Sequence, residues 1–266
     1  KLKNLRGKRL AVDLSAWVRE QKRMAKTKNV SSVPTRNLFN WCKKLLLEHR
    51  IKPFFVLGGQ RTGSQQKERK TLVDILGLPC CQIDRKAESV CAFLNEKGTV
   101  DGCITEGSDA FLYGAQTVYR KFNIEEEDPE IDEYNISDIE KKADLNRKKL
   151  IALNMLVGSD GIPGVGMVTA GQLLKEFGDD DPIKRLRRWT PNEVPEASQD
   201  KPSTSGQHKE KRDSTGSACD EGKEGKLELS VRKEMHGQGP HFKKVISEYM
   251  DSQTNIQDPG DFKWQS

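Results

Sequence analysis

Long apolar runs are missing from this sequence. Its longest apolar stretches, such as Phe54 to Leu57 and Leu45 to Leu47, fall far short of the roughly 20 residues that cross a bilayer as a helix. No segment has the basic start and apolar middle of a signal peptide. Aromatic residues make up 6% of the 266 residues, and charged residues 32%. These features argue against a membrane protein and predict a soluble chain with a modest core.

Metal-binding cysteine pairs are also missing. None of the six cysteines forms a CxxC pair, and Cys80 and Cys81 are adjacent. This spacing suits neither a zinc knuckle nor a simple disulfide ladder. We expect reduced, mostly buried thiols and no structural zinc site.

The net charge of +5 is unevenly distributed. Residues 191–266 hold 11 Lys+Arg and 14 Asp+Glu, a balance of −3, which leaves 34 against 26, or +8, for residues 1–190. A basic body suits a polyanion such as DNA, because neutralising phosphates releases counterions. Many other soluble proteins share this balance.

Apolar patterning predicts strands that alternate with helices. We expect strands at 8–15, 53–57, 80–83, 100–105 and within 111–122. We expect an exposed helix or arch at 16–28, and helices at 37–48, 71–76, 86–95, from a Ser137 cap onward, and at 146–157, 168–177 and 242–250. The alternation predicts an α/β fold with a mostly parallel sheet flanked by helices. From about 190 to 239 the chain loses periodicity and is rich in Pro, Ser, Gly and charge, which predicts a disordered linker.

Three acidic residues follow predicted core elements: Asp13, Asp109 and Asp160. The carboxyl ends of parallel strands meet at one sheet edge, and Glu88 lies in a helix beside it. Converging carboxylates suit hard cations such as Mg²⁺ or Mn²⁺, and a pair of such ions can activate water for phosphodiester hydrolysis. For any single aspartate, the alternative is a turn or helix cap.

A glycine-rich segment joins two predicted helices. In a helix-hairpin-helix module such a segment lets backbone N–H groups approach a DNA phosphate. An ordinary corner between helices is the alternative. The candidate DNA-binding residues are Gly161, Ile162, Gly164, Val165, Gly166 and Lys175, with Lys184, Arg185, Arg187 and Arg188 as possible extensions.

Three blocks carry a family resemblance: RGKRLAVDLSAWV from residue 6, CAFLNEKGTVDGCITEGSDAFLYGAQTVYRKF from 91, and LIALNMLVGSDGIPGVGMVTAGQLLKEFG from 150. They resemble the flap-endonuclease/XPG nucleases. The motif FLYGAQTVYR and the tail sequence HFKKVISEYM resemble those of the Holliday-junction-resolving, GEN-type branch.

The resemblance implies a PIN-like fold, two Mg²⁺ ions with Mn²⁺ as a substitute, and incision of 5′ flaps and four-way junctions near the branch point. It also implies a pair of molecules on a four-way junction and a nuclear role in DNA repair and recombination. Asp13, Glu88, Asp109 and Asp160 would be the catalytic metal ligands. The expected domains are a nuclease core (1–135), a part with the helix-hairpin-helix module (136–190), a linker (191–240) and a C-terminal fragment (241–266).

Three positions depart from the family pattern, because Gly58, Lys86 and Gly107 stand where the family has acidic residues. Segments before the hairpin and after the second strand are also shorter. The alternatives are therefore an active endonuclease, a weakened relative that binds branched DNA without cutting it efficiently, and an incomplete gene product. A flap or excision-repair nuclease is the runner-up among active enzymes.

Overall fold

The computed structural model describes residues 2–27, 34–59, 64–122, 124, 131–158, 161–189, 225–234 and 239–251. The chain forms two compact units. The first contains Lys1–Ile151 and Val245–Ser266, and the second contains Ala152–Lys244. The domain boundaries expected from the sequence stay predictions.

A six-stranded sheet forms the centre of the first unit within the described residues. Its strands are β1 (Arg9–Asp13), β2 (Lys52–Gly58), β3 (Cys80–Ile83), β4 (Gly102–Ile104), β5 (Thr117–Arg120) and β6 (Asp132–Asn135). They are arranged in the order β3-β2-β1-β4-β5-β6. All neighbours pair in parallel except β5 and β6, which are antiparallel. The predicted mostly parallel α/β sheet is confirmed.

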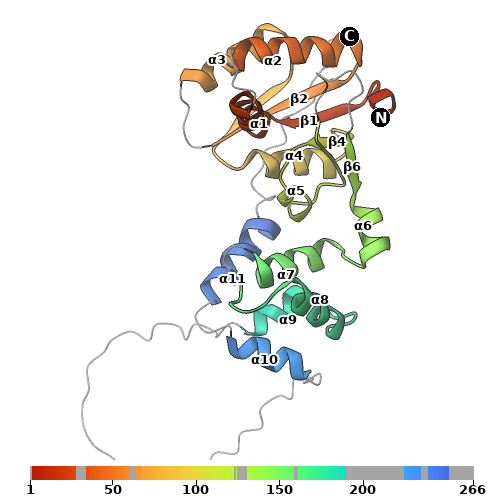
Figure 1. Cartoon of the computed structure of the whole chain (residues 1–266), viewed down its shortest axis with the longest axis vertical. Helices are drawn as coiled ribbons and strands as arrows, with labels where there is room; N and C mark the ends of the chain where they lie inside the picture. Colours follow the sequence, from red (N-terminus) through yellow and green to blue (C-terminus); the bar gives the residue numbers. More distant parts are fainter. Residues whose placement is uncertain are drawn as a thin grey trace, which may run out of the picture. The chain divides into compact units, whose positions relative to one another are not determined.

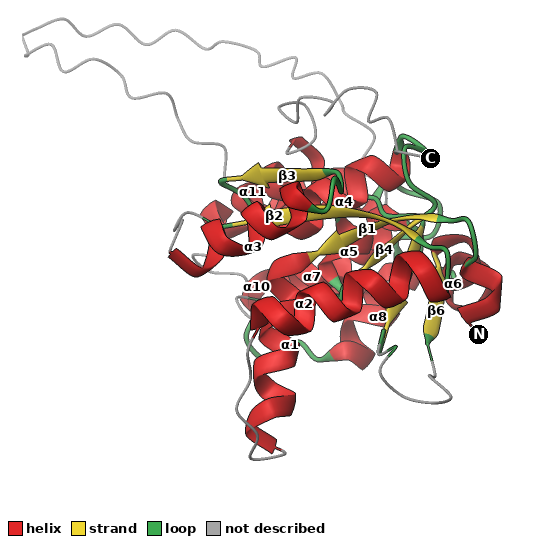
Figure 2. Ribbon diagram, turned by 90° about the horizontal axis from the view of Figure 1, so that it is seen from above, coloured by secondary structure: helices red, strands yellow, loops and turns green. Residues whose placement is uncertain are grey.

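Helices cover this sheet on two sides (Figures 1 and 2). One side carries α1 (Leu14–Thr27), α2 (Pro34–Lys43) with the π-helix η2 (Lys44–Glu48), and α3 (Ser64–Ile75). The other carries α4 (Ala87–Glu96) and α5 (Asp109–Leu112). The remaining elements of this unit are η1 (Leu2–Leu5), α6 (Ile136–Ala143), the start of α7 (Arg147–Val157), the end of α11 (Gly239–Ile246) and the π-helix η3 (Ser247–Asp251).

Alternation along the central strands divides their side chains between the two sides. Val12 of β1 and Phe55 of β2 belong to a cluster with Trp17, Leu38 and Trp41 of α1 and α2. The ring centroids of Trp17 and Trp41 are 5.3 Å apart. The intervening strand residues are also fully buried, on the side where α4 contacts β1, β2 and β4. Because both faces of these strands are buried, their sequences are continuous apolar runs.

The second unit is helical. It contains the rest of α7, α8 (Met167–Glu176), α9 (Pro182–Trp189), α10 (Lys226–Glu234) and the start of α11. Phe177 and Trp189 pack edge to face with ring centroids 6.2 Å apart. None of the helices in the described part of the chain is long and apolar enough to cross a membrane.

The strand expected within 111–122 is confirmed at Thr117–Arg120, which follows the end of the helix α5. Two other expectations for the secondary structure were wrong, and one strand was missed. Helix α6 begins after Asn135, so Ser137 lies inside the helix and does not cap it. The polar strand β6 was missed, because an edge strand with half-exposed residues has no apolar pattern. Helix α10 lies inside the expected linker; the rest of that segment, 191–224 and 235–238, falls outside the described residues.

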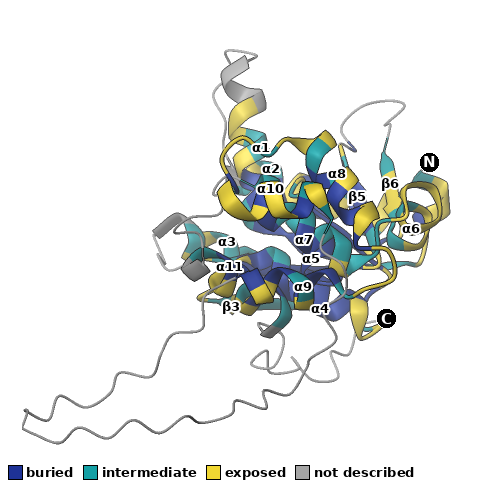
Figure 3. Ribbon diagram, turned by 90° about the horizontal axis from the view of Figure 1, so that it is seen from below, coloured by how far each residue is buried: buried dark blue, intermediate teal, exposed yellow. Residues whose placement is uncertain are grey.

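Burial separates the sheet from its periphery (Figure 3). The strands β1, β2 and β4 are almost wholly buried, whereas the eight residues of α6 include no buried side chain. Five cysteines, Cys42, Cys80, Cys81, Cys91 and Cys103, are free thiols. Cys219 is outside the described residues.

Candidate functional site

A cleft of about 550 Å³ opens at the carboxyl edge of the sheet in the first unit. It contains three of the four predicted site carboxylates, those of Asp13, Glu88 and Asp109. The fourth, Asp160, lies outside the described residues. The other residues that line the cleft are Ser15, Arg19, Gly58, Gly59, Asp84, Arg85, Lys86 and Ala87.

Asp13 is the last residue of β1, and its side chain is only 3% exposed. The backbone N–H of Ala16 donates to its Oδ1 over 2.8 Å, so one oxygen caps the first turn of α1. The other oxygen lies 4.0 Å from Nη2 of Arg19. Burial raises the pKa of Asp13, while the Ala16 amide and Arg19 act in the opposite direction. The helix cap at this residue is thus observed, and the same carboxylate also lines the cleft; its role as a metal ligand stays a prediction.

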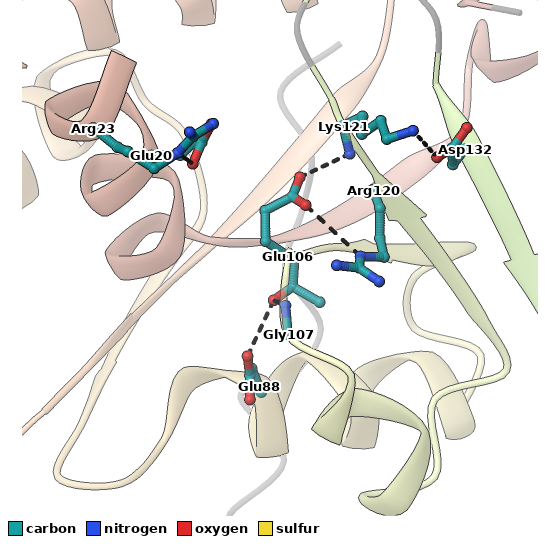
Figure 4. Close-up of polar contacts among 9 residues, drawn as sticks. Glu20, Arg23, Glu88, Glu106, Gly107, Arg120, Lys121 and Asp132 are labelled. Atoms are coloured by element: carbon teal, nitrogen blue, oxygen red, sulfur yellow. Dashed lines mark hydrogen bonds and ion pairs between the residues drawn. The ribbon is translucent and has the colours of Figure 1, made fainter. Parts of the chain in front are cut away.

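Glu88, in the first turn of α4, faces the end of β4 (Figure 4). The hydroxyl of Thr105 donates to its Oε1 over 3.3 Å. A β-carbon on Gly107 would overlap the same oxygen. Burial raises the pKa of Glu88, and the charges of Asp13 and Asp109 raise it further. The Glu88 carboxylate thus uses space that a side chain at position 107 would occupy.

Asp109 begins α5, and its side chain is about one-third exposed. Its Oδ2 lies 3.6 Å from Nζ of Lys86 and accepts a hydrogen bond from the Tyr249 hydroxyl over 3.3 Å. Lys86 also pairs with Glu248 over 2.8 Å. Burial lowers the pKa of Lys86, but the Glu248 and Asp109 carboxylates outweigh it, and the net shift is upward. This lysine therefore stays charged beside the cleft.

At Gly58 the fold leaves no room for a side chain. An added β-carbon would lie 2.5 Å from the backbone nitrogen of Ala87 and 2.7 Å from the carbonyl oxygen of Arg85. The amide of Gly59 donates to that same carbonyl over 3.1 Å. The end of β2 is thus packed directly against the start of α4, and no carboxylate can extend from position 58 in this arrangement.

Two further acidic residues lie near this edge. Asp84 lines the cleft and was missed, because it follows a weak strand signal and precedes two basic residues. Glu106 follows β4, but it accepts a hydrogen bond from the backbone of Lys121 over 2.7 Å and pairs with Arg120 over 3.7 Å. Figure 4 shows the Glu106 carboxylate directed toward β5, away from Glu88.

Carboxylate oxygens are the ligands that hard divalent cations prefer. Asp13 and Glu88 offer carboxylate oxygens in one cleft, and burial disfavours both as bare anions; this chemistry suits one hard cation. Asp109 is engaged by Lys86 instead. Within the described ranges, no group of three His, Cys, Asp or Glu side chains is placed to hold a metal ion. Asp13 and Glu88 are thus two possible ligands to one cation, and the described residues complete a full set of ligands neither for it nor for a second cation.

In the second unit, the glycine-rich segment joins α7 to α8 as predicted. Three of its amides are used internally, because Gly161, Ile162 and Val165 donate to the carbonyls of Gly158, Leu156 and Ile162. The Ile162 side chain is 3% exposed.

Two of the predicted amides, those of Gly164 and Gly166, donate to no backbone acceptor within the described residues. Gly164 has a φ of +79° with open space around its β-carbon position. Gly166 is the N-cap of α8. The exposed Lys175 lies in the last turn of that helix. Three of the six predicted contact residues therefore suit a phosphate. Gly164 and Gly166 have amides that donate to no described backbone acceptor, and Lys175 has an exposed charge.

One of the suggested basic extensions was wrong. Arg185 is directed inward, with a side chain 14% exposed, and it pairs with the buried Glu228 over 2.5 Å and with Asp180 over 2.8 Å. Its guanidinium also lies 4.7 Å from the ring centroid of Phe177. Lys184, Arg187 and Arg188 remain exposed on α9.

Two family models match consecutive parts of the chain. Residues 1–74 match the XPG N-terminal domain, and residues 77–160 match the XPG I-region. The chain belongs to the XPG nuclease family. The predicted PIN-like fold is confirmed by solved structures of XPG-family nucleases. The catalytic core of Rad2 in complex with DNA substrate aligns with a TM-score of 0.68 at 25% identity, covering 100% of this chain and 85% of that one.

Within the XPG family, the similarity is to the GEN branch. Mouse "Flap endonuclease GEN homolog 1" is 37% identical over 224 residues, which cover 71% of this chain and 25% of the mouse protein. Human GEN1 in complex with Holliday junction DNA aligns at 36% identity with a TM-score of 0.55, over 71% of this chain and 54% of that one. This chain thus spans about a quarter of the length of that curated relative.

Proposed function

We propose that this chain is a structure-specific DNA endonuclease that hydrolyses phosphodiester bonds near branch points, in 5′ flaps and four-way junctions. The observation that carries the proposal is the meeting of Asp13, Glu88 and Asp109 in one cleft of an XPG fold. The substrates follow from the relatives, which are named flap endonucleases or were solved with Holliday junction DNA. A nuclear location and a role in repair and recombination follow from the same likeness. Pairing of two molecules on a four-way junction is part of the proposal.

In this proposal Asp13 and Glu88 hold a Mg²⁺ ion, for which Mn²⁺ can substitute. Asp160 is a further candidate ligand. The bound ion would activate a water molecule and stabilise the leaving oxygen. The residues of the chain position the reaction, because the Ala16 amide fixes one oxygen of Asp13 and Thr105 fixes one of Glu88. The amides of Gly164 and Gly166, with Lys175, bind phosphates of one strand without reading its sequence.

Cleavage of labelled 5′ flap and four-way-junction DNA tests the proposal in Mg²⁺, in Mn²⁺ and with a chelator. Asp13→Asn is the sharpest variant, because asparagine preserves the cap on Ala16 while removing the charge. We expect metal-dependent cutting by the wild type and a loss of at least a hundredfold in Asp13→Asn, since a ligand to the cation is lost. Asp74→Ala, which removes an exposed carboxylate from α3, is the matched control. Undiminished cutting by Asp13→Asn would show that the site is assigned wrongly.

A second candidate function is binding of branched DNA without efficient cleavage. The pairing of Lys86 with Asp109 favours it, because a positive charge stands beside a candidate ligand. Retarded but intact DNA in every metal would support this candidate. Among active enzymes, preferential cutting of flaps or excision-repair bubbles over four-way junctions would favour the flap or excision-repair type.

The DNA contact of the hairpin has its own test. Gly164 and Gly178 both have positive φ, +79° and +57°, with open space around the β-carbon position. Valine strains the backbone at either site, but only Gly164 lies in the hairpin. We expect Gly164→Val to weaken binding at least tenfold on all DNA sequences alike, and Gly178→Val to leave it within about twofold. Equal losses in the two variants would assign the effect to strain.

A further inference from the structure

The ammonium of Lys86 lies in a cage built from two other parts of the first unit. Its Nζ is 2.8 Å from Oε1 of Glu248 and 3.6 Å from Oδ2 of Asp109. It also lies 6.0 Å from the centroid of the Tyr113 ring. Carboxylates and an aromatic face are the groups that bind a cation, and here the cation is part of the chain.

The two carboxylates of this cage are themselves held in place. The Tyr113 hydroxyl donates to Oε1 of Glu248 over 2.6 Å, and the Tyr249 hydroxyl donates to Oδ2 of Asp109 over 3.3 Å. The rings of the two tyrosines pack with centroids 4.8 Å apart. Each carboxylate is thus aligned by a tyrosine as well as by the lysine.

The segment that supplies Glu248 and Tyr249 is anchored from a third direction. Arg147 donates from Nη2 to the carbonyl oxygen of Tyr249 over 2.8 Å and from Nε to that of Leu112 over 2.9 Å. This guanidinium ties η3 to the end of α5, which begins with Asp109. The cage is therefore formed by residues more than a hundred positions apart and is part of the folded unit.

We propose that the Lys86 ammonium is a built-in cation that takes the place of a divalent ion on the Asp109 side of the cleft. A Mg²⁺ ion bonded to Oδ2 of Asp109 at about 2.1 Å would lie at most about 6 Å from this ammonium. The two positive charges would repel each other, and the ion would also have to displace the Tyr249 hydroxyl from the same oxygen. The cage therefore opposes a divalent cation at Oδ2 of Asp109. This statement rests on the cage alone, whereas a cation on Asp13 and Glu88 rests on the proposed function.

Counting bound Mn²⁺ on the full chain tests this inference without DNA or activity. Electron paramagnetic resonance of free Mn²⁺ during titration gives the number of ions per chain. Lys86→Glu replaces the ammonium with a third carboxylate beside Asp109 and Glu248. We expect it to bind about one ion more than the wild type. Lys86→Met keeps the aliphatic stem and frees the two carboxylates, and it should gain the same ion at about tenfold weaker affinity. Lys67→Glu makes the same charge change on an exposed position of α3 and should gain none.

The outcomes separate this inference from the proposed function. If neither Lys86 variant binds more Mn²⁺ than the wild type, or Lys67→Glu gains as much as they do, the inference is wrong. If the wild type binds no ion but both Lys86 variants gain one, the inference stands and the proposed cation on Asp13 and Glu88 is wrong. Should Lys86→Glu lose its native circular dichroism, Lys86→Met alone decides.

Discussion

Gly107 faces the Glu88 carboxylate so closely that a β-carbon at position 107 would overlap Oε1 of that glutamate. The nearby Thr105 hydroxyl bonds to the same oxygen. The position of the Glu88 side chain in the cleft therefore depends on the absence of a side chain at Gly107. Gly58, on the other side of the cleft, is equally crowded, but there by backbone atoms.

This difference predicts unequal costs for two alanine substitutions. Gly107→Ala meets the far end of a flexible side chain, so Glu88 can rotate away and the free energy of unfolding should change by less than about 1 kcal/mol. Gly58→Ala meets the backbone of Arg85 and Ala87 and should cost about 1–3 kcal/mol through overpacking. Urea unfolding followed by circular dichroism measures both. Equal costs would mean that the start of α4 yields as easily as the Glu88 side chain.

The carboxylates of the cleft predict a pH dependence of stability. The pKa values of Asp13 and Glu88 are raised, chiefly by burial, so the folded chain retains their protons to higher pH than the unfolded chain does. Their contribution to stability is therefore greatest in acid and declines as pH rises from about 4 through the raised pKa values. Asp13→Asn should flatten this decline and be more stable than the wild type near neutral pH. Unfolding curves at several pH values measure the stability of both proteins. If stability declines with pH equally in the wild type and in Asp13→Asn, the prediction is wrong.

The buried pair in the second unit predicts a large and recoverable loss. Glu228 is 1% exposed and accepts hydrogen bonds from Arg185 and from the Trp189 indole. Arg185→Met leaves this carboxylate buried without its main partner and should cost about 3–5 kcal/mol. Adding Glu228→Leu should recover at least about half of that loss, because the stranded charge is gone. Arg188→Met, on an exposed position of the same helix, should stay within about 0.5 kcal/mol. Additive losses in the double variant would contradict the pairing.

The described thiols should be slow to alkylate in the native protein. Burial raises the pKa of Cys42 and of Cys80 to about 12 and that of Cys81 to about 11. Since the thiolate is the nucleophile, labelling by iodoacetamide near pH 8 should be at least about tenfold slower than in urea. Peptide mass spectrometry resolves the individual cysteines. Rapid native labelling of Cys42 would show that helix α2 opens readily.

The sequence by itself determined the elements whose physical cause is local. The apolar runs of β1, β2 and β4 and the helical spacing of α4, α7 and α8 predicted their positions within a few residues, because burial on one or two faces imposes a period on the chain. The alternation of these elements predicted the parallel sheet. Since the carboxyl ends of parallel strands share an edge, it also predicted that Asp13, Glu88 and Asp109 would meet. Their catalytic role, and that of Asp160, stay predictions.

Only the tertiary structure decided which groups surround those carboxylates. Glu248 and Tyr249 contact Lys86 and Asp109 from a segment more than a hundred residues beyond Asp109, and no local pattern encodes these contacts. The direction of Arg185 depended on a buried glutamate 43 residues further along the chain, and the room for Glu88 depended on a glycine in another element. Periodicity reports which face of an element is buried. The partner of a charge is set by the packing of distant elements, and that information exists only in the folded chain.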